Sequence, residues 1–425
     1  MIEAVQPAID VRLTAELRRR DEILDTASAL FASRGLRISL EEIAGACGIK
    51  PGSLYHHFDS KEAIVIELIQ RYHAALDHLA EVSMDHDGAR TTGDPIDRVI
   101  ALATAIAACA SRHSAAVQFT FYDPPGGASQ ELVRVAGRAP TAIQTAMFET
   151  LRTGQEAGSI RPGLDLAIVS DRFCQTMLHV GLGLFHSLAP DQVARTLSAI
   201  LLHGLAAGQP RSADLDRSAA LAAVKQVIKT WPVPEEDPPT DRASMIYAAA
   251  RAELGRRGYE LTTIRDIAAA VGLGTGSVYR VIGSKEALLA SIMRDFSEKA
   301  VAGWTAALSS DATAVEKLDA VCWLQINVME RFYDEFKIQL AWLRQVPPDI
   351  PDLGWSFPAL LRRLKSQLAD GVRAGELTIE RPTSELAARC VVEVTWIPEN
   401  IVRDIGDRAA FLHARDTVLR GIATR

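Results

Sequence analysis

One string of residues occurs twice in this chain. GIKPGSLYHHFDSKEAI at residues 48–64 returns in altered form as GLGTGSVYRVIGSKEAL at residues 272–288. Upstream of it, the pair Ile43-Ala44 recurs as Ile267-Ala268, 224 positions later. This spacing is far longer than the few tens of residues that separate the repeats of a solenoid. The repeat therefore predicts two whole domains in tandem, and the Pro- and acid-rich segment KTWPVPEEDPPTD (229–241) is typical of a semi-stiff linker between them.

The composition indicates a globular protein rather than a disordered, membrane or disulfide-rich one. Of the 425 residues, 48% are hydrophobic and 23% are charged, and the net charge of -7 gives no sign of a nucleic-acid partner. Five widely spaced cysteines without a CxxC pair favour reduced thiols over disulfides or a zinc site. The N-terminal sequence lacks the apolar core of a secretory signal, and no stretch is apolar enough for a bilayer span. We expect a cytoplasmic protein that does not enter membranes.

Helical periodicity runs through the whole chain, so the expected fold class is all-α. RDEILDTASALFASRG (20–35) spaces its apolar residues at helical intervals and stops at Gly35. The tetrapeptides SLEE (39–42) and TIRD (263–266) predict capping boxes that start two short helices. Pro51 suits the first turn of a third helix, which we expect to end near Phe58.

Two short helices joined by a tight glycine-containing turn form a helix-turn-helix, whose second helix enters the major groove of DNA. Pro51 and Ser53 keep the start of that second helix slim, so that its backbone can approach base edges. Tyr55 and Lys61 can bond phosphates, and the amide-rich helix start at Ser39 adds partial positive charge. The repeat thus predicts two DNA-binding heads in one chain.

In both copies these residues resemble the DNA-binding domain of the tetracycline-repressor (TetR) family. The shared pattern runs from the IA pair through the glycine turn and G-S-(L/V)-Y to SKEA, and it covers roughly residues 18–73 and 242–297. The resemblance implies that the rest of each copy is a helical domain that binds a small effector and changes the separation of two heads. Family members are ordinarily homodimers, whereas this chain carries both heads, which is similar to tandem regulators of lipid or sterol uptake genes in actinobacteria.

The resemblance divides the chain into five regions. They are an N-terminal arm with the first helix-turn-helix head (1–74), a first helical ligand-binding and dimerisation domain (75–228), the linker (229–241), the second head (242–299) and a second helical domain (300–425). We expect the last helices of the two domains, roughly 165–208 and 383–424, to pack on each other as a pseudo-dimer within one chain. Pairing of two such chains into a homodimer stays open.

The family's contacts with double-stranded DNA carry over position by position. Phosphate contacts fall on Ser39, Tyr55, His57 and Lys61 in the first copy and on Thr263, Tyr279 and Lys285 in the second, where Val281 replaces the histidine. Base-reading positions fall on Lys50, Pro51, Ser53 and His56 in the first copy and on Gly274, Thr275, Ser277 and Arg280 in the second. Because these two sets differ, we expect a non-palindromic operator. The tyrosines have a second interpretation as packing residues, and the lysines as solvated helix-start residues.

The first helical domain holds a polar and aromatic set of candidate effector contacts: His113, Phe119, Tyr122, Phe173, Met177, His179 and Phe185. Ligand sites between helices are lined mainly by apolar side chains, so the expected effector is an apolar small molecule such as a lipid, a sterol or an acyl-CoA. No carboxylate or cysteine joins the histidines at ligand spacing, and we expect neither a metal nor another cofactor. The second domain is richer in large aromatics, among them Trp304, Trp323 and Trp396, which favours a filled core there and an effector in the first domain.

Two other functions compete with that of an effector-released DNA-binding repressor. GLGTGS (272–277) is similar to a dinucleotide-binding loop, but it follows a predicted helix rather than a strand, which argues against an enzyme. The other alternative is a regulator or scaffold whose second head has lost DNA contact and serves only the assembly of the pseudo-dimer. Val281 and the acidic net charge favour this alternative.

Overall fold

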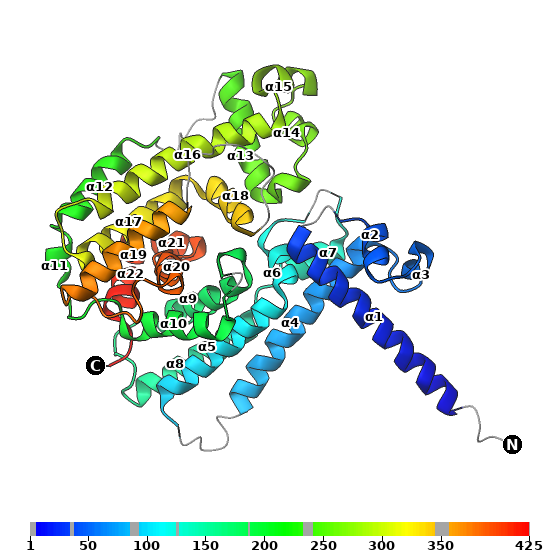
Figure 1. Cartoon of the computed structure of the whole chain (residues 1–425), viewed down its shortest axis with the longest axis horizontal. Helices are drawn as coiled ribbons and strands as arrows, with labels where there is room; N and C mark the ends of the chain where they lie inside the picture. The colour runs from blue at the N-terminus through cyan, green and yellow to red at the C-terminus, as the bar shows by residue number, and fades with distance from the viewer. Residues whose placement is uncertain are drawn as a thin grey trace.

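The computed structural model describes residues 6–34, 38–85, 93–124, 127–185, 188–232, 241–344 and 357–424. Within these ranges the chain is helical, and its β-structure is limited to two isolated bridges, Ile160 with Ala423 and Ala206 with Leu377. Figure 1 shows two small helical heads that project from one larger helical body. The predicted all-α fold is confirmed.

The two copies repeat the same order of a three-helix head, one long helix and a helical body. The first copy contains α1 (Gln6–Arg34), α2 (Leu40–Ala46), α3 (Pro51–Tyr55), α4 (Lys61–Asp85), α5 (Pro95–Arg112), α6 (Ser114–Phe121), α7 (Gln130–Ala136), α8 (Thr141–Glu156), α9 (Leu166–Leu178), η1 (His179–Gly181), η2 (Gly183–Phe185), α10 (Pro190–His203), α11 (Ser212–Leu215) and α12 (Ala219–Lys229). The second copy contains α13 (Arg242–Leu261), α14 (Ile264–Ala270), α15 (Thr275–Ile282), α16 (Lys285–Leu308), α17 (Ala314–Arg331), α18 (Tyr333–Arg344), α19 (Phe357–Arg373), α20 (Glu385–Val394), α21 (Glu399–Ile405), α22 (Asp407–Ala414) and η3 (Arg415–Arg420).

Both predicted capping boxes are present. The hydroxyl of Ser39 accepts a hydrogen bond from Glu42 N at 3.2 Å, and the Glu42 carboxylate accepts one from Ser39 N at 2.8 Å. Thr263 and Asp266 form the same reciprocal pair, at 3.2 Å and 2.8 Å. Each box satisfies backbone donors that the start of a helix leaves unpaired, so α2 and α14 begin where the sequence predicts.

The third helix of the first head is shorter than predicted. It ends at Tyr55 rather than near Phe58, because His57 N donates to Leu54 O at 2.9 Å and tightens the turn there. Its counterpart α15 runs one turn longer. Gly35, the predicted end of the first long helix, lies outside the described residues.

The two copies meet where the similar sequences LLHGLA (201–206) and VLRGIA (418–423) lie side by side. Leu205 N donates to Val418 O at 2.8 Å, and with the copies exchanged Ile422 N donates to Leu201 O at 3.1 Å. A second exchanged pair of backbone bonds joins Ala206 to 419 and Ala423 to 202. The junction is therefore built from the same segment of each copy, in two-fold-related pairs of backbone bonds.

Two glycines allow this close approach. Gly204 and Gly421 both have a φ near +73°, at 74° and 73°, which side chains other than glycine rarely adopt. A Cβ on Gly204 would lie 2.4 Å from Leu419 O, and a Cβ on Gly421 would lie 2.3 Å from the carbonyl carbon of His203. A side chain at either position would separate the two copies.

Buried charged side chains also cross the junction. Arg172 of the first copy is 1% exposed and donates to the hydroxyl of Thr417 in the second copy at 2.5 Å. Arg415 of the second copy is fully buried; it pairs with Asp319 at 2.7 Å and with Asp216 of the first copy at 2.9 Å. Removal of one partner from such a pair would leave a buried charge uncompensated, so these contacts fix how the copies fit together.

The helix that precedes the linker lies on the opposite copy. α12 packs against α16 and α17, the ring of Trp231 stands 5.1 Å from that of Phe332, and Arg331 donates to Ile228 O at 3.2 Å. The first copy thus reaches over the body of the second before the linker begins. No single described helix is long and apolar enough to cross a membrane; the joined pair α5 and α6 passes on length and composition, but it is bent by 86°.

Candidate DNA-binding heads and junction cavity

The first head presents its predicted base-reading residues to solvent. Lys50, Pro51, Ser53 and His56 are all exposed around α3, whereas Leu54 on the opposite side of the helix is fully buried. Apolar packing therefore fixes the orientation of this short helix and leaves its outer face available for a groove of DNA.

The second head has the same orientation with different chemistry. Gly274, Thr275 and Arg280 are exposed and Ser277 is half-buried around α15, while Val278 is buried. The preceding glycine-rich loop follows helix α14, so it lacks the strand that a dinucleotide-binding loop requires.

The paired tyrosines of the two heads are surface residues. Tyr55 is 47% exposed and Tyr279 is 50% exposed, so neither is a core packing residue. His57 is half-buried in the first head, and Val281, which stands in its place, is 37% exposed. An exposed tyrosine hydroxyl beside a groove-reading helix suits a hydrogen bond to a phosphate oxygen.

The side chains predicted to contact phosphates at the helix starts differ in the hydrogen bonds that they already make within the protein. The hydroxyl of Thr263 donates to the Asp266 carboxylate at 2.6 Å, and the Lys285 ammonium donates to Tyr259 O and lies 4.1 Å from the centre of the Tyr259 ring. Ser39 uses its hydroxyl as an acceptor in its capping box, and hydrogen bonds from the Ser39 backbone and hydroxyl hold the pKa of Glu42 below its usual range. Lys61 is half-buried.

An arginine next to the first head acts as an internal clamp. Arg20 donates to the Glu67 carboxylate at 2.9 Å through Nε, donates to His57 O, and lies 4.0 Å from the centre of the Phe58 ring. Arg18 is exposed. The three consecutive arginines at 18–20 therefore do not form one uniform basic arm.

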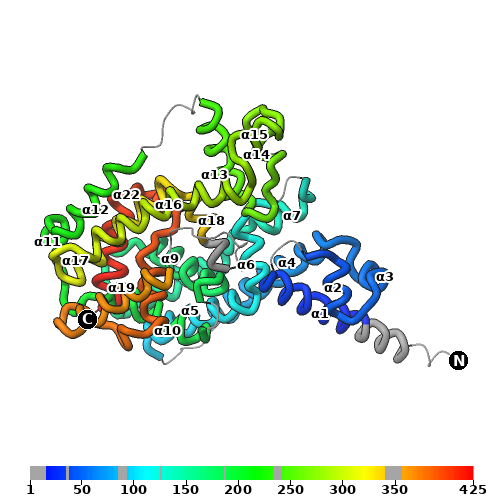
Figure 2. The backbone as a smooth tube through the Cα atoms, turned by 45° about the horizontal axis from the view of Figure 1, so that its top comes forward, coloured from blue at the N-terminus to red at the C-terminus, as the bar shows by residue number. Residues whose placement is uncertain are grey.

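The two heads are attached to the body in different ways. The first head shares an apolar cluster with α4, α6 and α7, and this cluster is separate from the main core. The main core continues into the second head, where α13 packs against α18 so closely that a Cβ on Gly255 would lie 2.6 Å from the Asp334 carboxylate. Figure 2 shows the second head beside the end of α6, where Asp123 N donates to Arg256 O at 3.0 Å. The second head therefore contacts both copies.

The seven candidate effector contacts are spread over several environments. Phe173 and Met177 are buried in the main core, and His113 is half-buried 6.1 Å from the ring of Tyr72. The remaining four line three different cavities, which hold Phe119 with Tyr122, His179, and Phe185. In the described part of the chain, Phe119 and Tyr122 therefore line the same cavity, and the other five candidates lie apart from them.

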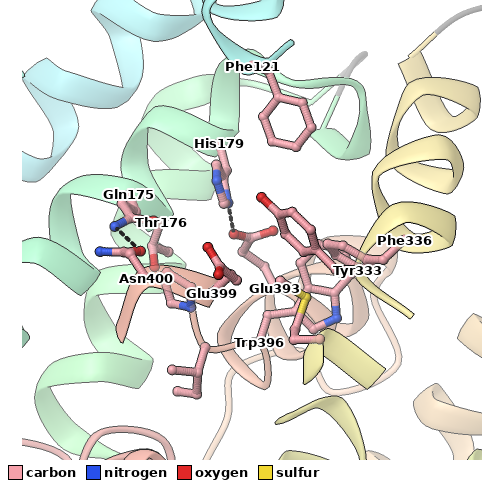
Figure 3. Close-up of a pocket in the computed structure, with 13 residues that line it drawn as sticks. Phe121, Gln175, Thr176, His179, Tyr333, Phe336, Glu393, Trp396, Glu399 and Asn400 are labelled. Carbon is pink, nitrogen blue, oxygen red and sulfur yellow. Dashed lines mark hydrogen bonds and ion pairs between the residues drawn. The ribbon is translucent and has the colours of Figure 1, made fainter. Parts of the chain in front are cut away.

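One of these cavities lies at the junction of the two copies and has a volume of about 120 Å³. Its lining comes from α6 and from the end of α9 in the first copy, and from α17, α18 and residues 393–400 in the second. Figure 3 shows the His179 ring above the carboxylates of Glu393 and Glu399, with the Tyr333 hydroxyl beside them. A hydrogen bond of 2.8 Å joins His179 Nδ1 to Glu393 Oε1, so residues of both copies form the polar centre.

Amide side chains close one end of this junction cavity. Gln175 of the first copy donates to Asn400 of the second at 3.0 Å, and both donate to the Asp171 carboxylate at 2.8 Å. Burial, together with the nearby Glu399 carboxylate, raises the pKa of Tyr333, so its phenol stays a neutral hydrogen-bond donor. Among the described residues, no group of three or more metal-ligating side chains is placed to hold a metal ion.

The sequence indicates His179 as a candidate but not the residues of the second copy that line the same cavity. Glu393 and Asn400 belong to no motif, and the 214 positions between His179 and Glu393 give no local signal of their contact. Trp396, which we expected in a filled core, lines the cavity and has an indole nitrogen without a hydrogen-bond partner among the described residues. Trp323 packs against Phe411 as a core residue, with ring centres 5.1 Å apart.

Comparison with known proteins gives matches in both heads. The family of bacterial regulatory proteins described as the tetR family matches residues 23–68 and 246–292. The HTH-type transcriptional repressor KstR2 of Mycobacterium tuberculosis (strain ATCC 25618 / H37Rv) is 33% identical over 191 residues, which are 44% of this chain and 92% of that protein. KstR2 of Rhodococcus jostii (strain RHA1) is 32% identical over 196 residues, with 44% and 91% covered. The solved structure of the ketosteroid transcriptional regulator KstR2 of Mycobacterium tuberculosis is 29% identical, has a TM-score of 0.32, and covers 43% of this chain and 92% of its own.

Proposed function

Because the chain belongs to the tetR family of bacterial regulatory proteins, and is therefore a transcriptional regulator, we propose that it is a repressor that holds one operator with two different heads. A small effector bound in the helical body releases this operator. The DNA that it binds lies in the cytoplasm, and we assign the protein to that compartment.

The observation that carries this proposal is the pair of exposed recognition helices with unlike side chains. Both helices are held by buried residues, Leu54 in the first head and Val278 in the second, and each follows a helix that begins with a capping box. Their outer faces differ at the position occupied by His56 in one head and Arg280 in the other. Arginine favours guanine, so the two heads would prefer different half-sites.

The exchanged backbone bonds at the junction support an intramolecular pseudo-dimer. Homodimers of helix-turn-helix proteins read palindromes because their two-fold axis is matched by that of the DNA. Here the bonds from Leu205 to Val418 and from Ile422 to Leu201 relate the two copies in the same way, but within one chain. We therefore propose one chain per operator, with half-sites that differ in sequence.

We assign the contacts to DNA as the sequence predicts them. Phosphate contacts are made by Ser39, Tyr55, His57, Lys61, Thr263, Tyr279 and Lys285, and base contacts by Lys50, Pro51, Ser53, His56, Gly274, Thr275, Ser277 and Arg280. The hydrogen bonds that Thr263 and Lys285 make within the second head would have to be exchanged for phosphate contacts when DNA binds.

The same two hydrogen bonds favour one alternative, a second head that serves assembly alone. Selection of operator sequences from random DNA, followed by quantitative binding at several salt concentrations, separates the two functions. The proposed repressor selects an asymmetric site with two conserved halves, and Tyr279→Phe weakens binding as Tyr55→Phe does. The alternative predicts a single conserved half-site and no effect of Tyr279→Phe.

A further inference from the structure

The junction cavity has an acidic and aromatic lining. The carboxylates of Glu393 and Glu399 enter it, and aromatic rings of Phe121, Tyr333 and Trp396 form its walls. Glu393 is 4% exposed, and only one of its two oxygens, Oε1, has a hydrogen-bond partner among the described residues. No lysine or arginine is among the residues that line the cavity.

The positive groups near the cavity already have partners. Arg403 pairs with Glu399 at 3.1 Å from outside, one turn along α21. The buried Lys337 ammonium lies 5.7 Å from the ring centre of Phe121 and 5.6 Å from that of Tyr333. These rings therefore already stabilise one ammonium ion, since an ammonium over an aromatic face is attracted by the ring quadrupole.

We propose that the junction cavity is the effector site and that it takes a small organic ammonium ion with an apolar body of about one ring. The ammonium lies between Glu393 and Glu399, with the Tyr333 hydroxyl within reach, and the apolar body packs against Trp396. A cavity of about 150 Å³ accommodates benzene, so 120 Å³ limits the apolar body to about that size. This inference rests on the proposed function and narrows its effector class.

The acidic lining opposes the polyanionic members of the expected effector class. The phosphates of an acyl-CoA would face two carboxylates with no lining cation to pair with, and like charges in a partly buried site repel strongly. A sterol exceeds a cavity of 120 Å³ and offers no cation to the two carboxylates. A single ammonium satisfies both the charge and the volume.

The cavity is connected to the second head through α18. Tyr333 and Phe336 line the cavity from this helix, and the opposite side of α18 packs against α13, with Asp334 next to Gly255. Phe121 lines it from α6, and the neighbouring Tyr122 hydroxyl donates to Lys337 O at 3.2 Å. A bound molecule that pushes α6 and α18 apart would therefore act on both heads, because α18 packs against α13 of the second head and α6 packs against α1 of the first.

Three probes of similar size test the charge requirement on the full-length chain: phenethylamine, 2-phenylethanol and phenylacetate. Binding is followed by calorimetry and by tryptophan fluorescence, for which Trp396→Phe identifies the reporting residue. We expect the amine to bind at least tenfold more tightly than the alcohol or the carboxylate. Glu393→Gln and Glu399→Gln should each remove most of this preference, while Glu81→Gln, an exposed glutamate far along α4, should not change it.

Equal binding of amine and carboxylate, or no amine binding at millimolar concentration, would overturn the inference. Glu399→Gln keeps the test valid if Glu393→Gln fails to fold, since Glu399 is partly exposed and its loss leaves the His179 pair intact. Operator binding by the ligand-free chain is measured separately. If the chain binds its operator but the amine does not bind, the effector assignment fails and the repressor proposal stands. If the amine binds but no operator is found, the ligand site stands and the repressor proposal fails.

Discussion

The two heads share one local design but are attached to the body in different ways. The first head forms an apolar cluster with α4, α6 and α7, and Arg20 clamps it through Glu67, His57 O and the Phe58 ring. The second head continues the main core and packs against α18, and its Arg256 O accepts a hydrogen bond from Asp123 of the first copy.

This difference determines which helices carry a structural change in the body to each head. α18 contacts both the second head and the junction cavity, so a change at the junction reaches that head directly. The first head is held mainly by its own copy. A duplicated fold can therefore keep two similar DNA-binding surfaces that are coupled to the body through different helices.

The largest expected effect comes from a substitution that separates the second head from α18. Gly255→Val places side-chain atoms against Asp334, where a Cβ alone would lie 2.6 Å from the carboxylate, and we expect a loss of about 1–3 kcal/mol in the stability of that head. Hydrogen exchange of α13–α15 measures it. Gly45→Ala in the first head is the control, because no atom lies within 4 Å of its Cβ. Equal protection of both heads in Gly255→Val would show that α18 does not hold the second head.

Substitution of the base-reading residues tests how the two heads differ in their base preferences. Arg280→Ala should relax the base preference at one position of one half-site by about 1–3 kcal/mol, since a bidentate arginine–guanine contact is lost. His56→Ala should have a smaller effect on the other half-site. Binding to a set of operators with single base changes measures both. A uniform loss of affinity over all operators would make Arg280 a phosphate contact instead.

Loss of the clamp should loosen the first head alone. Arg20→Ala removes charge-assisted hydrogen bonds and a cation–ring contact, and we expect the first head to lose about 1–2 kcal/mol. Arg18→Ala, at an exposed position of the same helix, is the matched control. Limited proteolysis within α1–α3 measures the effect. Equal cleavage of the two variants would contradict the role of Arg20.

A fall in pH should produce the smallest difference in stability between the two heads. Burial lowers the pKa of His73 and of His113, both of which lie at the apolar cluster of the first head, whereas residues 241–299 contain no histidine. A histidine whose folded pKa is lowered contributes stability above its unfolded pKa near 6.5, and that stability is lost as the pH falls below this value. From about pH 7.5 to about pH 5.5 we expect the first head to lose less than about 1 kcal/mol and the second head to change less.

Hydrogen exchange at the two pH values measures this difference between the heads. His113→Gln should reduce the acid sensitivity of the first head. An equal acid response of both heads would assign the sensitivity to the junction rather than to these histidines.

The sequence predicts the heads well because their signals are local. The Ser39–Glu42 and Thr263–Asp266 boxes each join residues three positions apart, and the buried faces of α3 and α15 follow from helical spacing. The predicted end of α3 is wrong because periodicity does not show that the chain tightens after Tyr55, where both His57 N and Phe58 N donate to Leu54 O. Where the second head makes its own internal hydrogen bonds, no spacing rule reveals that Lys285 turns back to Tyr259 O.

The junction could not be predicted in the same way. The cavity depends on His179 and Glu393, which lie in different copies, and α12 crosses to the second copy through packing on α16 and α17. Such contacts are set by how two preformed helical bodies fit, and apolar periodicity does not encode the partner. The glycines at 204 and 421 are one local indication of the junction, since each directly follows a helix, α10 and η3, and has a positive φ.

The central claim is that one chain binds one asymmetric operator with two unlike heads, and tethered DNA cleavage tests it most directly. A cleavage reagent is attached to Ser53→Cys or to Ser277→Cys in a Cys47→Ala background, where the remaining cysteines are buried. The account predicts that each variant cuts a different half-site, with cuts separated by about one helical turn of 34–36 Å or a multiple of it, and that reversal of the operator reverses both patterns. Equal cutting of both half-sites by either variant would contradict it, because two symmetry-related chains would then occupy the operator.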